Sequence, residues 1–124
     1  MKDLIYPELS YKVVGLLFKI YNELGYGCQE KHYHRAFKLE LEQNNLEYRQ
    51  EVLTPLTYHE RSIGRYFLDF VVEEKIAVEL KVANDFYKSH FKQILDYLKN
   101  SNLRLGIIAI FTKEGLKYKR ILNV

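Results

Sequence analysis

Apolar residues in the first third of the chain recur with the spacing of α-helices. Their stripe ends at Gly25, a residue type that commonly follows the last turn of a helix, and this predicts an amphipathic helix over residues 9–24. A second helix is predicted from about Glu30 to Asn44, after a turn whose two glycines permit left-handed backbone. The first stripe consists of Leu9, Val13, Leu16, Leu17, Ile20 and Leu24.

The middle of the chain has the pattern of β-strands. Residues 46–53 and 63–72 are predicted strands, separated by a loop over residues 54–62 around Pro55. A further strand over residues 76–82 would form a hairpin with the second of these. Because side chains alternate across a strand, it would carry Ile76, Val78, Leu80 and Val82 on one face and Ala77, Glu79, Lys81 and Ala83 on the other.

The last third predicts a helix followed by a buried strand. Asn84 and Asp85 are candidate N-caps of a helix that ends near Asn100, and the nearly continuous apolar run over residues 103–111 is typical of a strand buried on both faces. After a polar loop over residues 112–115, an extended piece ends at Leu122. The helix has an apolar stripe of Tyr87, Phe91, Ile94, Leu95 and Leu98 and a polar stripe of His90, Gln93 and Tyr97.

Composition narrows the class of protein. A chain of 124 residues with 48% hydrophobic and 28% charged residues suits one soluble α/β domain with a mixed sheet. We see no apolar run of the roughly 20 residues that span a bilayer and no signal-peptide core, and the single cysteine fits a reducing compartment, so we expect a cytoplasmic protein. The net charge of +3 permits a nucleic-acid partner without requiring one.

Two carboxylates in the central hairpin need an explanation. Asp69 and Glu79 are equidistant from Glu74, so an odd-length turn centred there would place them opposite each other, with Cβ atoms about 5 Å apart. Like charges in that position destabilise a sheet, and a divalent cation bound between them would remove the penalty. The alternative is an exposed ion pair of either acid with Lys81, which would contribute little.

These residues match known motifs. The set of Asp69 and Glu79-x-Lys81 resembles the core motif of the PD-(D/E)xK nuclease superfamily, with Leu68 where the conventional proline stands, and the order of predicted elements is similar to its αβββαβ core. Gly27-x-x-Glu30-x-x-Tyr33 resembles the signature of the GxxExxY family, a branch of that superfamily, and Gln93-x-x-x-Tyr97 is similar to a QxxxY motif. The resemblance implies a restriction-endonuclease-like fold over residues 1–124, a single domain in which helices flank a mixed sheet and an additional helix precedes the core.

The resemblance also implies an activity. It suggests a nuclease that uses Mg²⁺, with Mn²⁺ as a substitute, to hydrolyse phosphodiester bonds of DNA, which we favour over RNA. Asp69, Glu79 and Glu30 would bind the metal, Lys81 would be the catalytic lysine, and Gln93 and Tyr97 would support it. Tyr33 is expected to be a core residue with a hydrogen-bonding tip.

The sequence also permits other functions and a different metal site. The same fold could be a catalytically silent module that binds nucleic acid or protein, or a nucleotide phosphohydrolase. A zinc site at Cys28, His32 and His34 is disfavoured because His34 leaves the shared helix face and no fourth ligand follows at a recognisable spacing. The small size of the chain favours a homodimer, the absence of a visible specificity module favours a partner that selects the target, and we expect no membrane contact.

Overall fold

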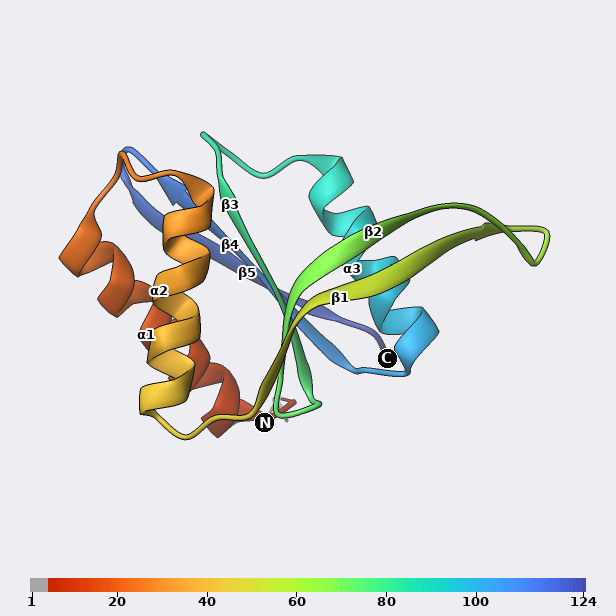
Figure 1. Ribbon diagram of the computed structural model, residues 1–124, viewed down its shortest axis with the longest axis horizontal. Coiled ribbons are helices and arrows are strands. Elements are labelled where there is room, and N and C mark those ends of the chain that lie inside the picture. The colour runs from red at the N-terminus through yellow and green to blue at the C-terminus, as the bar shows by residue number, and fades with distance from the viewer. Residues whose placement is uncertain (1–4) are drawn as a thin grey trace.

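The computed structural model describes residues 5–124 as three helices and five strands (Figure 1). The predicted order of elements is confirmed, and the final extended piece is a strand. The helices are α1 (Pro7–Leu24), α2 (Glu30–Gln43) and α3 (Lys88–Ser101), and the strands are β1 (Tyr48–Tyr58), β2 (Arg61–Val72), β3 (Ile76–Val82), β4 (Leu105–Thr112) and β5 (Gly115–Leu122).

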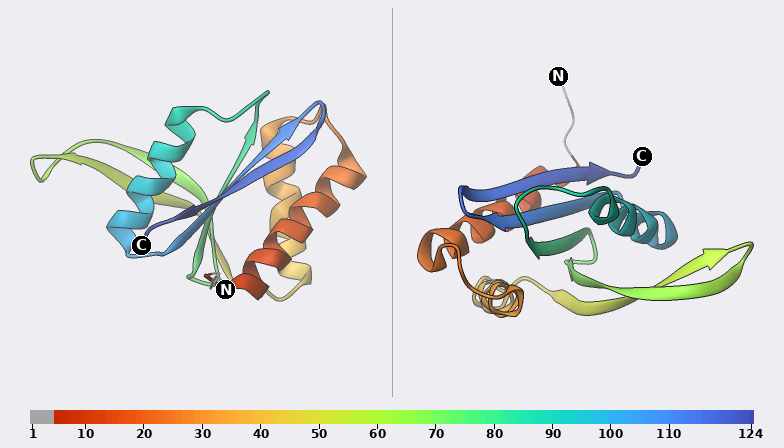
Figure 2. Two further views of the ribbon diagram at one scale, coloured as in Figure 1. Left: turned by 180° about the vertical axis from the view of Figure 1, so that it is seen from behind. Right: turned by 90° about the horizontal axis from the view of Figure 1, so that it is seen from above.

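The five strands form one mixed sheet in the order β1-β2-β3-β4-β5. β3 and β4 are parallel and are connected through α3, while the other neighbouring pairs are antiparallel. Helices α1 and α2 cover one face and α3 covers the other, which is clearest in the right-hand view of Figure 2. Elements α2 to β4 form the restriction-endonuclease-like αβββαβ core that the sequence predicts, with α1 before it and β5 after it.

Strand β4 is the centre of the hydrophobic core. All eight of its residues are buried, as expected for a strand covered on both faces. Gly106 lets α3 approach β4 closely, since a Cβ atom added there would lie 2.7 Å from Cδ1 of Ile94. The two faces of the sheet therefore have separate cores, one beneath α1 and α2 and one beneath α3.

The β2–β3 hairpin has the predicted register. Phe70 pairs with Val78 and Val72 with Ile76, so the turn has three residues and is centred on Glu74. Pairing between β2 and β3 ends at Phe70 and Val78, and before this point along the chain β2 pairs with β1 alone. The strands thus separate where Asp69 and Glu79 would have paired, and we call this point the fork.

The predicted loop over residues 54–62 is wrong. β1 and β2 continue as a long two-stranded ribbon that projects from the body, and we call residues 52–68 the arm (Figures 1 and 2). Pro55 fits because β1 is an edge strand, where a missing backbone N–H is tolerated. The connecting residues His59 and Glu60 both have positive φ, which Gly or Asn usually provides, so the sequence gives no hairpin signal there.

Two details of the helices also differ from prediction. α3 begins at Lys88, with Tyr87 as its N-cap, so neither Asn84 nor Asp85 caps it and Tyr87 is 52% exposed rather than part of the core stripe. Tyr97, assigned to the polar stripe, is buried. Within residues 5–124 no helix is long and apolar enough to cross a membrane.

Candidate active site

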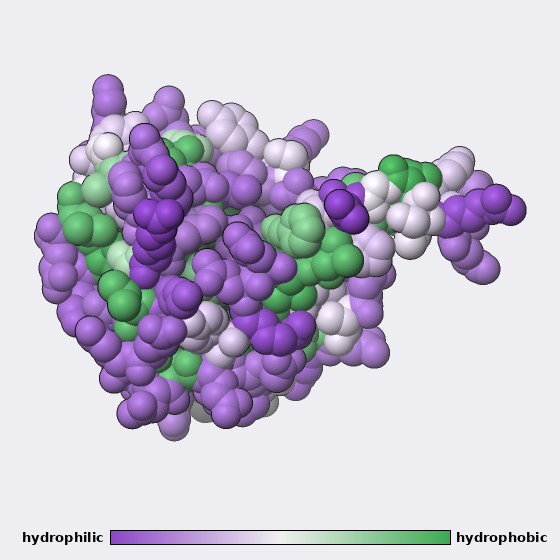
Figure 3. Space-filling view, in the orientation of Figure 1, coloured by the Kyte–Doolittle hydropathy of each residue, from purple (hydrophilic) through white to green (hydrophobic). Residues whose placement is uncertain are grey.

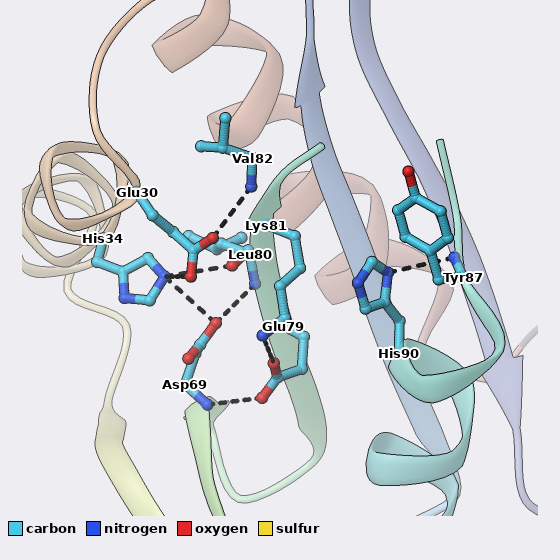
Figure 4. Close-up of polar contacts among 9 residues, drawn as sticks. All are labelled: Glu30, His34, Asp69, Glu79, Leu80, Lys81, Val82, Tyr87 and His90. Carbon is cyan, nitrogen blue, oxygen red and sulfur yellow. Dashed lines mark hydrogen bonds and ion pairs between the residues drawn. The ribbon is translucent and has the colours of Figure 1, made fainter. Parts of the chain in front are cut away.

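Asp69 and Glu79 meet at the fork and bond to each other's strand. Oδ2 of Asp69 accepts a hydrogen bond from the Leu80 N–H at 2.8 Å, and Oε1 of Glu79 accepts one from the Asp69 N–H at 2.9 Å (Figure 4). The carboxylates thus replace carbonyl oxygens that the separating strands no longer supply. The two acids lie on opposite strands, as the spacing around Glu74 predicts, but each carboxylate contacts the backbone of the other strand.

The carboxyl of Glu79 is in an unfavourable place for a charge. The residue is 2% exposed, and its burial together with the charge of Asp69 raises the pKa of this carboxyl to about 7. The hydrogen bond from the Asp69 N–H and the ammonium of Lys81 act in the opposite direction without compensating. A buried carboxylate beside a second carboxylate attracts further positive charge.

Lys81 provides part of that charge. Its Nζ lies 3.5 Å from Oε2 of Glu79, and about a quarter of its side chain, 27%, is exposed to solvent. Glu79 and Lys81 are two residues apart in β3 and share the face predicted from strand alternation. The ammonium therefore contacts the acid while its side chain remains partly accessible from solvent.

Glu30 reaches the same site from the start of α2. It is the first helical residue, and its Oε2 accepts a hydrogen bond from the Val82 N–H at 3.1 Å. An acid in this position is also favoured by the helix dipole. The structure thus brings Glu30, Asp69, Glu79 and Lys81 together around the end of the β2–β3 pairing (Figure 4).

Tyr33 anchors the turn that presents Glu30. Its hydroxyl donates to the Gly25 carbonyl at 2.6 Å and accepts from the Cys28 N–H at 3.3 Å, while its fully buried ring stacks on Phe111 at 3.9 Å between centroids. Gly27 has φ 118°, which strains other residue types. The Gly-x-x-Glu-x-x-Tyr spacing thus has a structural basis, and Tyr33 is the core residue with a polar tip that we expected.

His34 is a site residue that the sequence reasoning missed. Its Nε2 lies 3.3 Å from Oδ2 of Asp69, 3.3 Å from the Leu80 carbonyl oxygen and 3.9 Å from Oε1 of Glu30. Burial alone would lower the pKa of this imidazole, but the hydrogen bond and charge of Asp69, with the other two oxygens, raise it. The available signal was the i, i+4 spacing from Glu30, which places both side chains on one helix face.

The other two predicted residues come from α3. Tyr97 is buried beside Ile94 and Leu98, and its hydroxyl accepts a hydrogen bond from Nη2 of Arg49 at 3.3 Å. Gln93 is half-buried one turn earlier. Their supporting role is untested by these contacts and stays a prediction.

His90, in the first turn of α3, is influenced by the charge of Lys81. Its Nδ1 accepts from the Tyr87 N–H at 3.4 Å, and burial followed by the charge of Lys81 lowers the pKa of the ring.

The site offers carboxylate oxygens as ligands, and some of these oxygens accept hydrogen bonds from backbone N–H groups. Among residues 5–124, no group of three or more His, Cys, Asp or Glu side chains is arranged to hold a metal ion. The chemistry of the donors nevertheless fits a hard divalent cation, since two carboxylates converge and one is buried beside its like charge. The zinc ligands considered above, Cys28, His32 and His34, do not converge on one point. His32 accepts a hydrogen bond from the Gln29 N–H, whereas His34 contacts Asp69 at the fork.

The comparisons with known proteins bear on the fold and the family of this chain. Comparison with curated protein sequences gives no significant match. Among solved structures, the crystal structure of SSO0001 aligns with 95% of this chain at a TM-score of 0.56 and 17% sequence identity, a likeness that shows the fold alone. The chain spans 60% of the length of that structure.

The match to a protein family is broader. The profile of the PD-(D/E)XK nuclease superfamily matches residues 7–121, from the start of α1 nearly to the end of β5. Because the match covers nearly the whole chain, and the fold agrees with it, the chain belongs to the PD-(D/E)XK nuclease superfamily.

Proposed function

We propose that this protein is a Mg²⁺-dependent nuclease that hydrolyses phosphodiester bonds of DNA at the fork. The single observation that carries the proposal is the meeting of Asp69 and Glu79 at the end of the β2–β3 pairing, with Lys81 beside them. Members of the superfamily are usually nucleases and typically use divalent metals such as Mg²⁺. In this proposal the acids and the lysine are the residues of the family motif.

Asp69 and Glu79 would hold the metal, with Glu30 as a third ligand. When bound, a divalent ion supplies charge stabilisation and lowers the pKa of a water molecule. His34 contacts the oxygens of two of these ligands, so it can orient Asp69 and Glu30, and we add it to the proposed site.

Lys81 would bind the scissile phosphate. Its ammonium is held by Glu79 and is partly open to solvent, which suits a group that neutralises charge as it develops on phosphate oxygens. Gln93 and Tyr97 are proposed to support this lysine from α3. Manganese is expected to substitute for magnesium, since both ions accept carboxylate and water ligands.

The direct test is degradation of labelled single-stranded, double-stranded and branched DNA with Mg²⁺ or Mn²⁺. Asp69→Asn and Lys81→Ala should each lower the rate by about 100-fold or more, the loss typical when an electrostatic group is removed from an active site. Glu114→Gln in the β4–β5 turn and Lys99→Ala at the end of α3 are matched exposed controls and should cut like wild type.

Thermal unfolding of each variant should show that the fold is retained. Wild-type protein that is inert on every DNA substrate would overturn the proposal, and release of phosphate from nucleotides in the same samples would identify a nucleotide phosphohydrolase instead. Binding of DNA that persists in excess chelator, without cleavage, would identify a silent binding module.

We further propose membership of the GxxExxY branch, a cytoplasmic location, a homodimer and a partner that selects the target. The first is supported by Gly27, Glu30 and Tyr33, whose contacts position the acid. The homodimer is tested by light scattering, and a monomer at high concentration would contradict it.

A further inference from the structure

The arm exposes an apolar pair beside a cation. Leu53 and Phe67 pair across the two strands, so their side chains share a face of the ribbon, and they are 53% and 52% exposed. The guanidinium of Arg65, two residues from Phe67 on the same strand, lies 6.0 Å from the centroid of the Phe67 ring. An aromatic ring with an adjacent arginine therefore faces solvent.

The opposite face of the arm is already occupied. Val52, Tyr66 and Leu68 pack into the core beneath α3. This packing fixes the orientation of the ribbon and turns Leu53 and Phe67 away from α3. Figure 3 shows green and pale surface along the arm and at its base, among the purple of the body. The exposed pair is thus held in place by a packed face behind it.

The arm is continuous with the candidate site. Phe67 is two residues from Asp69 on β2, and the core contacts of the strand change at this point. Leu68 packs beneath α3 and Phe70 packs beneath α1 and α2, although both are even-numbered. Opposite Asp69, Glu51 has φ 54°, a left-handed conformation that accompanies this change. The face that carries Phe67 therefore leads directly to the fork.

The composition of the arm suits a nucleic-acid strand. Its charged side chains are Arg61 and Arg65 against Glu60 alone, with His59 beside them in the turn. At about 3.3 Å per residue, the strand from Asp69 to Arg61 extends about 26 Å, long enough to lie beside several nucleotides. An exposed ring flanked by arginine is the combination on which unpaired bases stack while their phosphates contact positive charge.

We infer that the open face of the arm, formed by Leu53, Arg65 and Phe67, binds an unpaired DNA strand that runs away from the cleavage site. This inference deepens the proposed nuclease function and rests on it. A base stacks on Phe67 and Leu53, and Arg65 contacts the neighbouring phosphate. The pair of apolar side chains has no donor or acceptor for the base edges of an intact duplex, which favours unpaired bases over groove recognition.

The test measures binding without cleavage, by fluorescence anisotropy of the full chain with labelled single-stranded oligothymidine in EDTA. Phe67→Ala should weaken binding about fivefold or more, the loss of one base stack, and Phe67→Trp should restore it. Arg65→Ala should weaken binding and lower the salt dependence by about one phosphate contact. The matched controls are Tyr11→Ala on α1, whose ring is 83% exposed, and Arg104→Ala before β4.

The outcomes separate this inference from the proposed activity. Weaker binding by Phe67→Ala and Arg65→Ala, with normal binding by Tyr11→Ala and Arg104→Ala, supports the arm whether or not DNA is cut. Unchanged binding by both arm variants, with wild-type cleavage, overturns the arm and leaves the nuclease. If light scattering instead shows a dimer that Phe67→Ala dissociates while oligothymidine binding is unchanged, the face belongs to a second copy and the inference is wrong.

Discussion

The two halves of β2 experience opposite environments. Phe70 and the two residues after it are buried and paired on both sides, with β1 and with β3. Phe67, three residues earlier, is 52% exposed in a ribbon that projects from the body. Asp69 lies between these halves. The candidate site therefore lies where a strand passes from the core to solvent, so that buried backbone fixes Asp69 while its side chain keeps some exposure to solvent.

The largest expected effect compares the two phenylalanines. Phe70→Ala should destabilise the protein by about 3–5 kcal/mol, because it leaves a cavity beside Phe37 and Tyr48 in the core. Phe67→Ala should cost less than about 1 kcal/mol, since the ring is half-exposed. Urea unfolding of the two variants measures the difference. Equal losses would mean that the arm is as tightly packed as the core.

Two strand glycines give a second matched pair. Gly106→Ala should destabilise by about 1–3 kcal/mol, because the new methyl group would lie 2.7 Å from Ile94 beneath α3. Gly64→Ala on the arm meets only Cδ1 of Leu56 at 3.8 Å and should be neutral or slightly stabilising. Thermal unfolding would test both, and a neutral Gly106→Ala would show that α3 can move away from β4.

The order of elements, the buried β4 and the hairpin centred on Glu74 were predictable because each depends on local periodicity or spacing. The arm was not, because Pro55 suggested a loop and the turn at His59 and Glu60 lacks glycine. His34 was missed because its partner Asp69 is 35 positions away in sequence and reaches it only through the packing of α2 over the fork. Local patterns thus predicted the sheet and the register of the hairpin, whereas the contact of His34 with Asp69 depends on tertiary packing.

The fork itself should respond to pH. Glu79 has a pKa near 7 in the folded protein against 4.5 as its ordinary value, so between these values the folded state holds a proton that the unfolded chain has lost. The contribution of protonated Glu79 to the free energy of unfolding is therefore fully present at low pH, and it is lost as pH rises through this window. Glu79→Gln should leave stability nearly unchanged at pH 4, where both states hold the proton, and raise it by roughly 1–3 kcal/mol at pH 8.

Chemical denaturation of wild type and Glu79→Gln at the two pH values measures this effect. Mg²⁺ added at pH 8 should stabilise the wild type, because it neutralises the same charge, and should stabilise the variant less. If Glu79→Gln changed the free energy of unfolding by the same amount at both pH values, Glu79 would be ionised throughout and its raised pKa would be wrong.

The smallest expected effect concerns Glu51, opposite Asp69. Its φ of 54° is unfavourable for a residue with a side chain, and Glu51→Gly should relieve this strain. Because glycine also increases the entropy of the unfolded chain, the net gain should be at most about 1 kcal/mol. Thermal unfolding would test it, with Glu47→Gly as a comparison that should only destabilise.

The exchange of acceptors at the fork has a mechanical consequence. Each carboxylate adds one hydrogen bond between β2 and β3 beyond the last backbone pair. A ligand that draws the Asp69 carboxylate toward itself therefore breaks the bond from the Leu80 N–H, and one that draws Glu79 breaks the bond from the Asp69 N–H. Binding of a ligand at the site is therefore coupled to the loss of these two hydrogen bonds. Amide hydrogen exchange at Asp69 and Leu80 should become faster when the ligand binds.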